Sequence, residues 1–567
     1  MIRIVGGKAR KVPGGISFFV SFLYRPDSVA AIKSLPLAVW HKKEAVWEIP
    51  EWVLPEALDR LAFLDEIELI SAHPEISAIS GEGPLTEREL SDFRVRPFRH
   101  QTEGIDFMLR HKRCLLLDAP GLGKTMQAIY WADALRKRGL INHCLIICGI
   151  NSLKSNWRRE IRKFSDSDCV IIGERLKKSG EISPTPAPMK ERARQLREPI
   201  KEFFAIVNVE SIRSEEIVRA ILESKNEFGA MIFDELHKCS GTSSEQGRNL
   251  LKLKAEWMVG LTGTVITNDP LDCYLPLKWI GADSSTLTNF KASFCEFGGF
   301  GGHQIVGYKN LDFLREELSS VSLRRTKDVA VGLPPKLISV ELLDMEEDHA
   351  KFYDAIKAGV REEADKIELN SANLLALTTR LRQATADPAI LTSNPVSATK
   401  LERCRELVEE LVGQGEKVVV MSVFKDPIYK LESMLSEFRP LVNTGDVADL
   451  TVSRNIERFQ SDPEAKVFLA TAAKCGTGIT LNAASHMICL DIPWTDALFQ
   501  QMTDRIHRLD NKSTAFVTVL ACRGTIDQRV LDIVESKKQI SDFVVDGKQN
   551  ELAQSLKSEM AKIIREL

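Results

Sequence analysis

A loop suited to holding phosphate lies at residues 118–125, with the sequence DAPGLGKT. It follows the apolar run CLLL at 114–117 and precedes a helical stretch, which is the strand, loop, helix order of a phosphate cradle. Gly121 and Gly123 let backbone amides approach phosphate oxygens. Lys124 would reach the β and γ phosphates, and the Thr125 hydroxyl would ligate Mg²⁺. Asp118 stands where the general consensus has its first glycine, so an ordinary turn remains the alternative for the loop taken alone.

A pair of acidic residues completes this chemistry later in the chain. Asp234 and Glu235 come directly after the apolar run AMIF at 230–233. Asp234 is predicted to hold Mg²⁺ through water, and Glu235 to orient and deprotonate the attacking water, because hydrolysis of a phosphoanhydride needs positioning and a base. A solvated acidic strand end is the alternative, which the upstream loop disfavours. ATP and Mg²⁺ are therefore the expected cofactors.

Two arginines near the end of the chain suit the same reaction. Residues 500–511 read QQMTDRIHRLDN, and a helix there would place Arg505 and Arg508 one turn apart. Both guanidinium groups could then stabilise charge developing on the γ phosphate when a second lobe closes. A surface helix with salt bridges is the alternative for this segment alone.

The elements that must position these groups form an alternating pattern. Short apolar runs are separated by helical stretches from about residue 89, which predicts a parallel sheet covered on both faces. The first set comprises CLLL (114–117), CLIIC (144–148), FFAIV (203–207) and AMIF (230–233), and the second KVVVMSVF (417–424), KVFLAT (466–471) and HMICLD (486–491). Residues 270–395 lack such runs and are predicted to be mainly helical. The chain therefore repeats one α/β architecture.

Bulk composition excludes several classes of protein. The 76 Lys and Arg residues nearly balance 79 Asp and Glu, so any nucleic-acid contact must be a local patch. No apolar stretch approaches the roughly 18 residues of a membrane span, and the 11 cysteines form no zinc pattern. The run ISFFVSFLY at 16–24 mimics a signal peptide, but serines interrupt it and the phosphate chemistry requires intracellular nucleotide. We expect an intracellular protein, cytoplasmic or nucleoid-associated, and neither secreted nor membrane-bound.

Taken in order, the motifs resemble those of helicase superfamily two, and within it the Swi/Snf-type ATPases. The resemblance covers roughly residues 94–548. It rests on RPFRHQTEGIDFM (96–108), DAPGLGKTMQAI (118–129), LIICGINSLKSNWRREIRKF (145–164), DELH (234–237), LTGTVITNDPLDCY (261–274), SLRRTKDVAVGLPPK (322–336), LTTRLRQATADPAIL (377–391), GTGITLNAAS (476–485) and QMTDRIHRLDN (501–511). The LRRTK and LPPK elements separate this subfamily from DEAD-type RNA helicases. The resemblance implies two RecA-like parallel-sheet lobes with helical insertions.

The resemblance also implies roles for individual residues. Gln101 would read the adenine edge, and LTGT at 261–264 would relay the nucleotide state to a DNA groove. The residues expected to bind nucleotide are Gln101, Gly121, Leu122, Gly123, Lys124, Thr125, Met126 and Gly478. Those expected to follow the phosphates of one DNA strand are Ser152, Lys154, Asn208, Ser422, Lys425 and Thr471. A stepping motor grips backbone independently of sequence, through amides, hydroxyls and a few cations.

Two departures from the family pattern concern the coupling between lobes. Asp510 and Asn511 stand where Gly and Gln are usual, and Thr495 and Asp496 follow Trp494 where Asn and Pro are usual. Neither departure touches the phosphate loop or the paired arginines. An active ATPase is therefore still predicted.

The first 50 residues differ in charge from the rest, with eight basic residues against three acidic ones. They predict a strand at 16–24, a helix opening near residues 26 and 27, and a hairpin through 40–49, with a helix near 55–64 closing a small α+β module. Residues 24–50 are similar to the HARP substrate-recognition domain of annealing helicases. The basic surplus favours a DNA-facing module, whereas Trp40 and Trp47 could equally fill a core.

These observations predict five regions: a HARP-like module at 1–88, an ATP-binding lobe at 89–269, a helical insertion region at 270–395, a second lobe at 396–523, and C-terminal brace helices at 524–567. The leading hypothesis is an ATP-dependent translocase on duplex or forked DNA that could remodel forks or anneal strands. A strand-separating helicase and an ATP-switched DNA clamp are the alternatives. The sequence leaves protein partners and oligomeric state open, with a monomer as one expectation.

Overall fold

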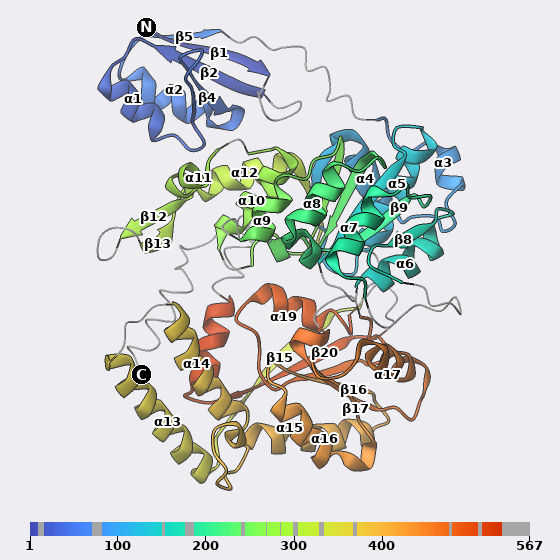
Figure 1. The fold of residues 1–567 in the computed structure, drawn as a ribbon. Coiled ribbons are helices and arrows are strands. Elements are labelled where there is room, and N and C mark those ends of the chain that lie inside the picture. The colour runs from blue at the N-terminus through green and yellow to red at the C-terminus, as the bar shows by residue number, and fades with distance from the viewer. Residues whose placement is uncertain are drawn as a thin grey trace. The chain divides into compact units, whose positions relative to one another are not determined.

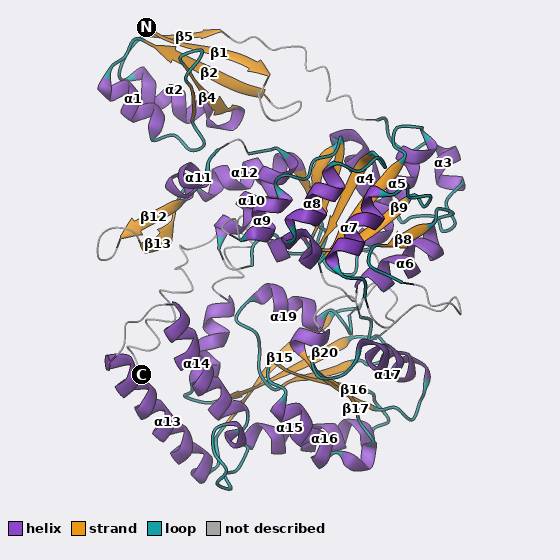
Figure 2. Ribbon diagram, in the orientation of Figure 1, coloured by secondary structure: helices purple, strands orange, loops and turns teal. Residues whose placement is uncertain are grey.

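The computed structural model describes residues 1–8, 16–70, 82–149, 153–175, 186–239, 244–267, 269–283, 285–298, 304–327, 334–366, 371–475, 479–507 and 513–535. The chain divides into two compact units. Described residues up to Lys327 belong to the first and those from Pro334 to Glu535 belong to the second. Each unit is described by itself below. Figures 1 and 2 show their ribbons coloured by chain position and by secondary structure.

The N-terminal module is a five-stranded sheet in the order β3-β4-β2-β1-β5 with two helices against it. Its elements are β1 (Ile2–Lys8), β2 (Ile16–Phe22), α1 (Pro26–Lys33), β3 (Val39–His41), β4 (Val46–Pro50), α2 (Leu54–Ala62) and β5 (Ile67–Ile70). The expected strand, helices and hairpin are all present within a few residues. Trp40 pairs with Trp47 across the hairpin. Alternate strand residues such as Ile4, Val20 and Ile49 fill the core against the helices.

The rest of the first unit is built on a seven-stranded parallel sheet in the order β14-β6-β11-β10-β7-β9-β8. Its strands are β6 (Arg113–Leu116), β7 (His143–Cys148), β8 (Cys169–Ile171), β9 (Phe204–Asn208), β10 (Phe228–Asp234), β11 (Trp257–Leu261) and β14 (Ser322–Leu323). The four apolar runs of the first set form β6, β7, β9 and β10. Because helices cover both faces, the central strands β7, β9, β10 and β11 are buried almost throughout.

Ten helices and a hairpin of the described residues surround this sheet. The helices are α3 (Glu87–Ser91), α4 (Arg99–His111), α5 (Lys124–Lys137), α6 (Leu153–Phe164), α7 (Met189–Arg197), α8 (Glu215–Leu222), α9 (Glu245–Leu250), α10 (Tyr274–Ile280), α11 (Leu287–Phe294) and α12 (Leu311–Val321). The hairpin comprises β12 (Cys295–Gly298) and β13 (Gln304–Tyr308). Helix α5 has ten consecutive buried residues from Met126 to Leu135, including the polar Gln127 and Asp133, because it packs inside the unit on all sides.

The second unit repeats the plan with a six-stranded parallel sheet in the order β15-β20-β19-β16-β18-β17. Its strands are β15 (Lys336–Leu343), β16 (Val418–Ser422), β17 (Leu441–Asn443), β18 (Val467–Thr471), β19 (His486–Cys489) and β20 (Ala515–Cys522). Its helices are α13 (Glu347–Lys366), α14 (Ser371–Ala386), α15 (Thr399–Gly413), α16 (Asp426–Met434), α17 (Asp449–Ser461), α18 (Ala472–Cys475) and α19 (Asp496–Thr503). The prediction of an α/β protein with two parallel-sheet lobes is confirmed.

The region 270–395 differs from the separate helical insertion that the sequence suggests. Its first part belongs to the first sheet, because β14 pairs in parallel with β6. Its second part belongs to the second sheet, because β15 pairs in parallel with β20. Neither strand has the continuous apolar run by which the sequence reveals a buried strand. β14 has only two residues, and β15 is a half-exposed strand at the edge of its sheet.

The segment beginning at residue 524, expected to start the C-terminal brace, packs into the second unit. Ile526, Val530, Ile533 and Val534 lie in the apolar core beside β19 and β20. The remainder of that segment, from residue 536, lies outside the described residues. The described part of this segment, residues 524–535, therefore contributes one buried face to the second unit's core.

Candidate functional site

The phosphate-binding loop joins the carboxyl end of β6 to helix α5. Gly121 and Gly123 both have positive φ, 90° and 82°, a conformation that suits glycine because it has no β-carbon. A β-carbon on Gly123 would also collide with the Gln101 amide. Helix α5 begins at Lys124, so its first backbone amides are available for an anion, as the spacing of the motif predicts.

The Lys124 ammonium group points back into the loop. Nζ donates hydrogen bonds to the carbonyl oxygens of Asp118 at 2.7 Å and Ala119 at 3.4 Å. Burial lowers the pKa of Lys124, whereas the carboxylates of Glu235, Asp118 and Asp234 oppose that shift. The structure thus brings the predicted loop lysine and the predicted acidic pair into one electrostatic cluster.

Asp234 is the last residue of β10, at the carboxyl edge of the sheet. Burial raises the pKa of Asp234 to about 7, and the neighbouring charge of Glu235 adds to the shift. The Trp157 indole donates a hydrogen bond to Asp234 Oδ2 at 2.9 Å, which fixes the carboxylate. A cation at this position would relieve the repulsion between the two acids.

Glu235 has a left-handed backbone conformation, with φ 55°. That conformation costs about 1 kcal/mol or more for a residue with a side chain, and such strain is frequently kept where a side chain must be aimed. It turns the chain sharply after Asp234, so that neighbouring residues place both carboxyl groups near Lys124.

His237 connects this acidic pair to the next strand. Its Nδ1 lies 3.0 Å from Thr262 Oγ1 and 3.3 Å from Glu235 Oε2. Since the Thr262 hydroxyl donates to the carbonyl of Thr264 at 2.8 Å, Nδ1 must carry the proton that it shares with Thr262. Burial lowers the pKa of His237, which favours this neutral form. The LTGT segment therefore contacts the acidic pair through His237, a link consistent with its expected relay role.

The donor set fits Mg²⁺. That ion favours hard oxygen ligands, binds through one or two protein side chains, and leaves its other positions to water and substrate phosphates. The Thr125 hydroxyl and the Asp234 carboxylate are groups of this kind at the phosphate loop. In the described ranges no cluster of three or more His, Cys, Asp or Glu side chains forms a closed metal cage.

Gln101, expected to read adenine, is buried against the loop. Its Oε1 accepts from the Phe98 amide at 2.9 Å, and its Nε2 donates to the Leu122 carbonyl at 3.3 Å. Leu122 and Met126 have buried side chains, so any nucleotide contact they make is through the backbone. In this structure Gln101 holds the loop, and adenine contact remains a prediction.

Arg505 does not lie on the expected helix. Helix α19 ends at Thr503, and Arg505 follows in a turn in which its own carbonyl accepts from the Leu481 amide and its Nη1 donates to the Ile479 carbonyl at 3.3 Å. The chain leaves the helix because this turn pairs with residues 479–481. The expectation of a helix through both arginines is wrong at Arg505, while Arg508 and Gly478 lie outside the described residues.

The predicted DNA-contacting residues lie at the carboxyl ends of strands or just after them. Asn208, Ser422 and Thr471 are the last residues of β9, β16 and β18, and Lys154 follows β7 at the start of α6. In open parallel sheets this edge is where ligands bind. Lys425 is half-exposed and pairs with Asp446 at 3.2 Å. Ser152 lies outside the described residues.

Two of these residues are occupied by contacts within their unit. Ser422 is fully buried, and its hydroxyl donates to Asp491 at 2.6 Å, so a direct hydroxyl contact with DNA is not supported. The Asn208 amide donates to Glu210 at 2.6 Å and accepts from the Ser211 hydroxyl at 2.6 Å. The sequence could not reveal this because strand-end polar residues look alike whether they face solvent or a buried carboxylate.

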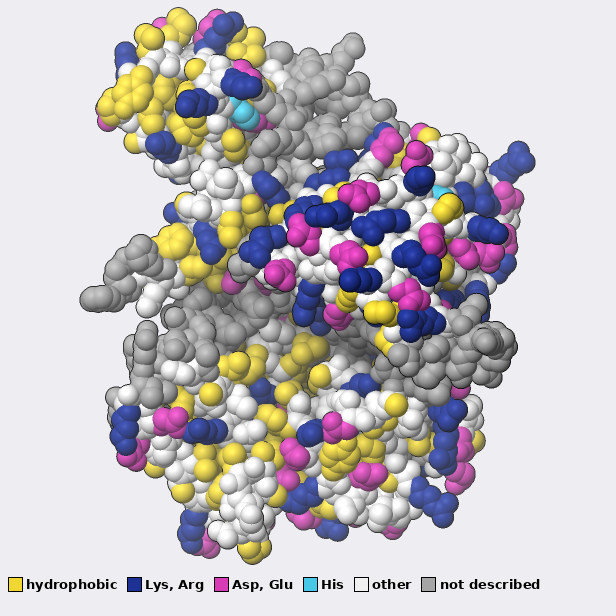
Figure 3. All heavy atoms as spheres, viewed as in Figure 1, with side chains coloured by type: hydrophobic (Ala, Val, Ile, Leu, Met, Phe, Trp, Pro, Cys, Tyr) yellow, Lys and Arg dark blue, Asp and Glu magenta, His cyan; other side chains and the backbone are white. Residues whose placement is uncertain are grey.

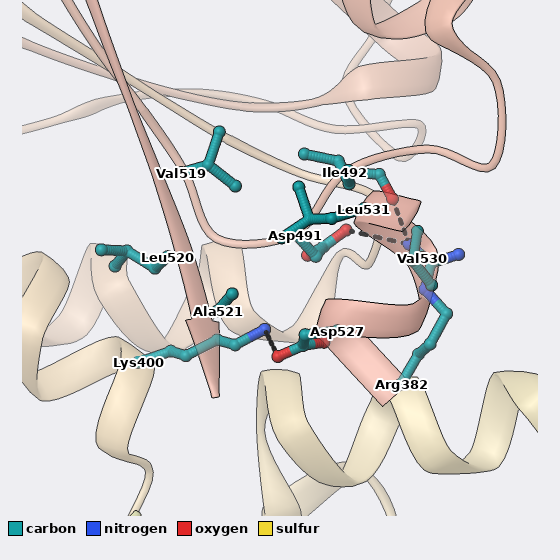
Figure 4. A pocket seen from close by; sticks show the side chains of 10 residues that line it. All are labelled: Arg382, Lys400, Asp491, Ile492, Val519, Leu520, Ala521, Asp527, Val530 and Leu531. Atoms are coloured by element: carbon teal, nitrogen blue, oxygen red, sulfur yellow. Dashed lines mark hydrogen bonds and ion pairs between the residues drawn. The ribbon is translucent and has the colours of Figure 1, made fainter. Parts of the chain in front are cut away.

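A second charged cluster, which sequence reasoning missed, lines a small pocket in the second unit (Figure 4). Lys400 is fully buried and pairs with Asp527 at 2.5 Å, while Arg382 lies 3.7 Å from Asp491. The Thr385 hydroxyl also donates to Asp527. Each cation thus faces a carboxylate, and the cluster joins α14, α15, the end of β19 and the segment after β20.

Comparison with known proteins decides the family. Residues 100–390 match the SNF2-related domain, and residues 399–510 match the helicase conserved C-terminal domain. The chain belongs to the SNF2-related, helicase-type ATPases. The resemblance to Swi/Snf-type members of helicase superfamily two is therefore confirmed.

Several individual proteins resemble this family member. It is 26% identical over 544 residues to the uncharacterized ATP-dependent helicase MG018 of Mycoplasma genitalium, covering 93% of this chain and 48% of that protein. It is 23% identical over 506 residues to the human DNA annealing helicase and endonuclease ZRANB3, covering 85% and 43%. The SWI2/SNF2 ATPase core of Sulfolobus solfataricus, solved with dsDNA, matches with a TM-score of 0.36 and 20% identity, covering 83% of this chain and 95% of that one. The chain spans about half or less of the length of the two helicases.

Proposed function

We propose that this chain is a DNA-dependent ATPase that moves along double-stranded or branched DNA. The observation that carries the proposal is the cluster at the first sheet's carboxyl edge, where Lys124, Asp234 and Glu235 lie beside a glycine loop that opens a helix. Its features match the requirements of phosphoanhydride hydrolysis: a cation for phosphate, a metal-binding carboxylate and a base. Membership of the SNF2-related family supports the same chemistry.

Each side chain has a distinct task in this proposal. Lys124 exchanges its backbone carbonyl partners for phosphate oxygens, which relieves the cost of its burial. Thr125 and Asp234 would hold Mg²⁺, which when bound neutralises phosphate charge. Glu235 accepts the proton of the attacking water, and its strained backbone aims the carboxylate. His237 fixes Glu235 and links it to Thr262.

The second unit supplies Arg505 in this account. Its guanidinium group is buried, with Nη1 on a backbone carbonyl, so it is held in one orientation. A preorganised arginine stabilises charge that develops on a transferred phosphoryl group. Arg508 keeps the same proposed role from the sequence alone.

Duplex DNA as the track is the finer part of the proposal. Support comes from the family and from Lys154, a cation close to the carboxyl edge of the first sheet. Lys154 is mostly buried, and its burial lowers its pKa, a cost that a phosphate contact would offset. Elsewhere on the first unit, basic and acidic side chains are interspersed over the α7 and α8 face, so that face does not offer a basic track (Figure 3).

Comparing the ATP hydrolysis rate with four cofactors tests this proposal: single-stranded DNA, duplex DNA, forked DNA and RNA. Duplex or forked DNA should stimulate hydrolysis strongly. Equal stimulation by RNA would refute the DNA assignment. Release of the third strand of a triplex separates a stepping motor from an ATP-switched clamp, and a strand-displacement assay tests a strand-separating helicase.

Fork remodelling or strand annealing is a second, narrower candidate, resting on the N-terminal module. One observation favours it: Trp40 is 46% exposed and its ring centroid lies 5.2 Å from that of Trp47, so an aromatic side chain at this surface is accessible for stacking on a base. Charge gives less support than the first 50 residues suggest, because residues 51–70 add six acidic residues and one basic residue. Trp40→Ala should weaken binding to forked DNA while leaving duplex-stimulated hydrolysis unchanged.

A further inference from the structure

A buried ion pair lies directly behind the phosphate loop. Arg325 and Asp118 contact each other through two hydrogen bonds, Nε to Oδ1 at 2.9 Å and Nη2 to Oδ2 at 2.5 Å. Asp118 is fully buried and Arg325 is 7% exposed. Such two-point arginine–carboxylate pairs fix geometry as well as charge. Asp118 is the residue that stands in place of the first consensus glycine, so the departure from the consensus has a structural partner.

Arg325 also contacts the far side of the loop. Its Nη2 donates to Gln127 Oε1 at 3.0 Å, and Gln127 in turn donates to Asp118 Oδ2 at 3.1 Å and to the Leu122 carbonyl at 3.3 Å. A third guanidinium nitrogen donates to the His100 carbonyl. Arg325 therefore holds the first residue of the loop, Asp118, and a residue in the first turn of the helix after it, Gln127.

The backbone around Arg325 reinforces this arrangement. The Leu117 amide donates to the Leu323 carbonyl at 2.8 Å, and the Ala119 amide donates to the Arg325 carbonyl at 2.9 Å. The strand pairing of β14 with β6 thus continues into the loop. Asp118 and Ala119 are the two residues whose carbonyls accept from the Lys124 ammonium group. Asp118 thus links the two cations: its carboxylate binds Arg325 and its carbonyl accepts from Lys124.

The glycine at position 104 leaves room for the side chains of this network. A β-carbon on Gly104 of helix α4 would overlap the Gln127 amide oxygen and lie 2.6 Å from Arg325 Nη2. A buried ion pair is generally no more stabilising than a well-packed apolar pair of the same volume. Stability alone therefore gives a weak reason for burying this pair, whereas orientation of the loop gives a strong one.

We propose that Arg325 is a positioning residue for the nucleotide: through Asp118 and Gln127 it holds the phosphate loop in the shape that presents Lys124 to the β and γ phosphates. The proposal rests on the proposed ATPase function of the same loop. In this role Arg325 acts through Asp118 and Gln127, whose side chains its guanidinium group contacts. It comes from the segment that leads toward the second unit, more than 200 residues after the loop.

The test compares Arg325→Gln with Arg138→Gln in the full chain. Arg138 makes a similar two-point pair with Glu89 at 2.7 and 3.0 Å in the same unit, at the end of α5 far from the loop. Affinity for a fluorescent ATP analogue with Mg²⁺, the KM for ATP and the melting temperature are measured for both. We expect Arg325→Gln to weaken nucleotide binding by a factor on the order of ten to a hundred, because small misplacements of binding groups have effects of that size. Arg138→Gln should stay within about twofold while also lowering the melting temperature.

Two further variants separate positioning from mere stability. Arg325→Lys keeps the charge and should recover part of the nucleotide affinity. Asp118→Asn combined with Arg325→Gln removes both charges, so its melting temperature should recover relative to Arg325→Gln while nucleotide affinity stays low.

The outcomes are distinct. Wild-type affinity in the double variant, or equal losses of affinity in Arg325→Gln and Arg138→Gln, would overturn the positioning role. If the wild-type chain binds no nucleotide, the proposed ATPase function itself fails. Binding by the wild type that Arg325→Gln leaves unchanged defeats the present inference alone.

Discussion

Two charged clusters, one in each unit, contain a lysine beside carboxylates, yet their electrostatics are opposite. Lys400 is fully buried, and although burial opposes its charged form, Asp527 and other acids outweigh it and raise the pKa. The Lys124 side chain as a whole is partly exposed, but its ammonium group lies inside the loop. Burial of that group lowers the pKa of Lys124, although three nearby acids oppose the shift. Lys400 has a carboxylate at 2.5 Å, whereas the hydrogen bonds of Lys124 go to backbone carbonyls.

The difference teaches how to separate a ligand site from a structural one. In the Lys400 cluster each cation faces a carboxylate of the same unit, Lys400 with Asp527 and Arg382 with Asp491. The cluster therefore links secondary-structure elements and has no need of a charged ligand. Within the described residues, the Lys124 cluster holds a cation whose hydrogen bonds go to backbone carbonyls and a carboxyl group, Asp234, whose pKa burial raises to about 7. A nucleotide with Mg²⁺ supplies the missing charges of both signs. Four predictions test this contrast, beginning with the largest expected effect.

Glu235→Gln should lower the turnover of ATP by about a thousandfold, within the range for loss of a general base. Nucleotide should remain bound, because the amide is nearly isosteric and Lys124 is intact. Steady-state hydrolysis and binding of a fluorescent analogue measure the two effects separately. Turnover at the wild-type rate would mean that another group is the base.

Lys400→Met should destabilise the second unit by about 3–5 kcal/mol, because it leaves the Asp527 carboxylate buried without its cation. Replacing both residues, with Asp527→Asn, should restore part of that loss, because the asparagine removes the buried charge and keeps an acceptor for the Thr385 hydroxyl or the Cys522 amide. Denaturant unfolding measures the change, and nucleotide affinity serves as the control that should not move. A change in affinity as large as that of a phosphate-loop variant would contradict the structural role.

A nucleotide analogue with Mg²⁺ should stabilise the first unit by about 2.7 kcal/mol at one hundred times its dissociation constant. Chelation of Mg²⁺ should remove most of this gain, since Asp234 then keeps its unfavourable charge next to Glu235. Thermal unfolding with and without EDTA provides the measurement. An equal gain in the presence of the chelator would count against metal binding at Asp234.

His349 should give the smallest effect, a loss of stability in acid. It is fully buried, with Nε2 donating to the Ala384 carbonyl at 2.8 Å and Nδ1 on the Thr399 hydroxyl at 3.0 Å. Burial lowers its pKa, with nearby Lys400 adding to the shift and Asp348 and Asp527 opposing it.

Because the folded state resists protonation, the unfolded state binds more protons below the ordinary pKa of 6.5. Stability should therefore be constant above that value and fall by up to about 1.4 kcal/mol per pH unit below it. His349→Gln should flatten this dependence between pH 7 and 5 in denaturant titrations. An unchanged slope in the variant would assign the acid sensitivity to other groups.

The sequence predicts the buried parts of the fold well and the edges poorly. Apolar runs mark the central strands because those strands are covered on both faces, as at β7 and β9. The edge strands β14 and β15 lack that signal and escaped detection, so residues 270–395 were expected to form a helical region of their own. Ser422 shows the same limit for polar residues, since its burial depends on Asp491 from a distant strand.

Some residues of the candidate site can likewise be predicted from the sequence and others cannot. Lys124, Asp234 and Glu235 are predictable because the loop and the strand end dictate them locally. The Asp118–Arg325 pair is not, because its partners are more than 200 residues apart and each alone reads as a surface charge. The position of Arg505 in a turn depends on pairing with residues 479–481, which no local helical pattern reveals.

Nucleotide affinity in Lys124→Ala and Lys400→Met, measured side by side with Mg²⁺ and a fluorescent ATP analogue, tests the central contrast most directly. The account predicts loss of binding in Lys124→Ala and wild-type affinity in the folded fraction of Lys400→Met. Unchanged binding in Lys124→Ala, or equal loss in both variants, would contradict it.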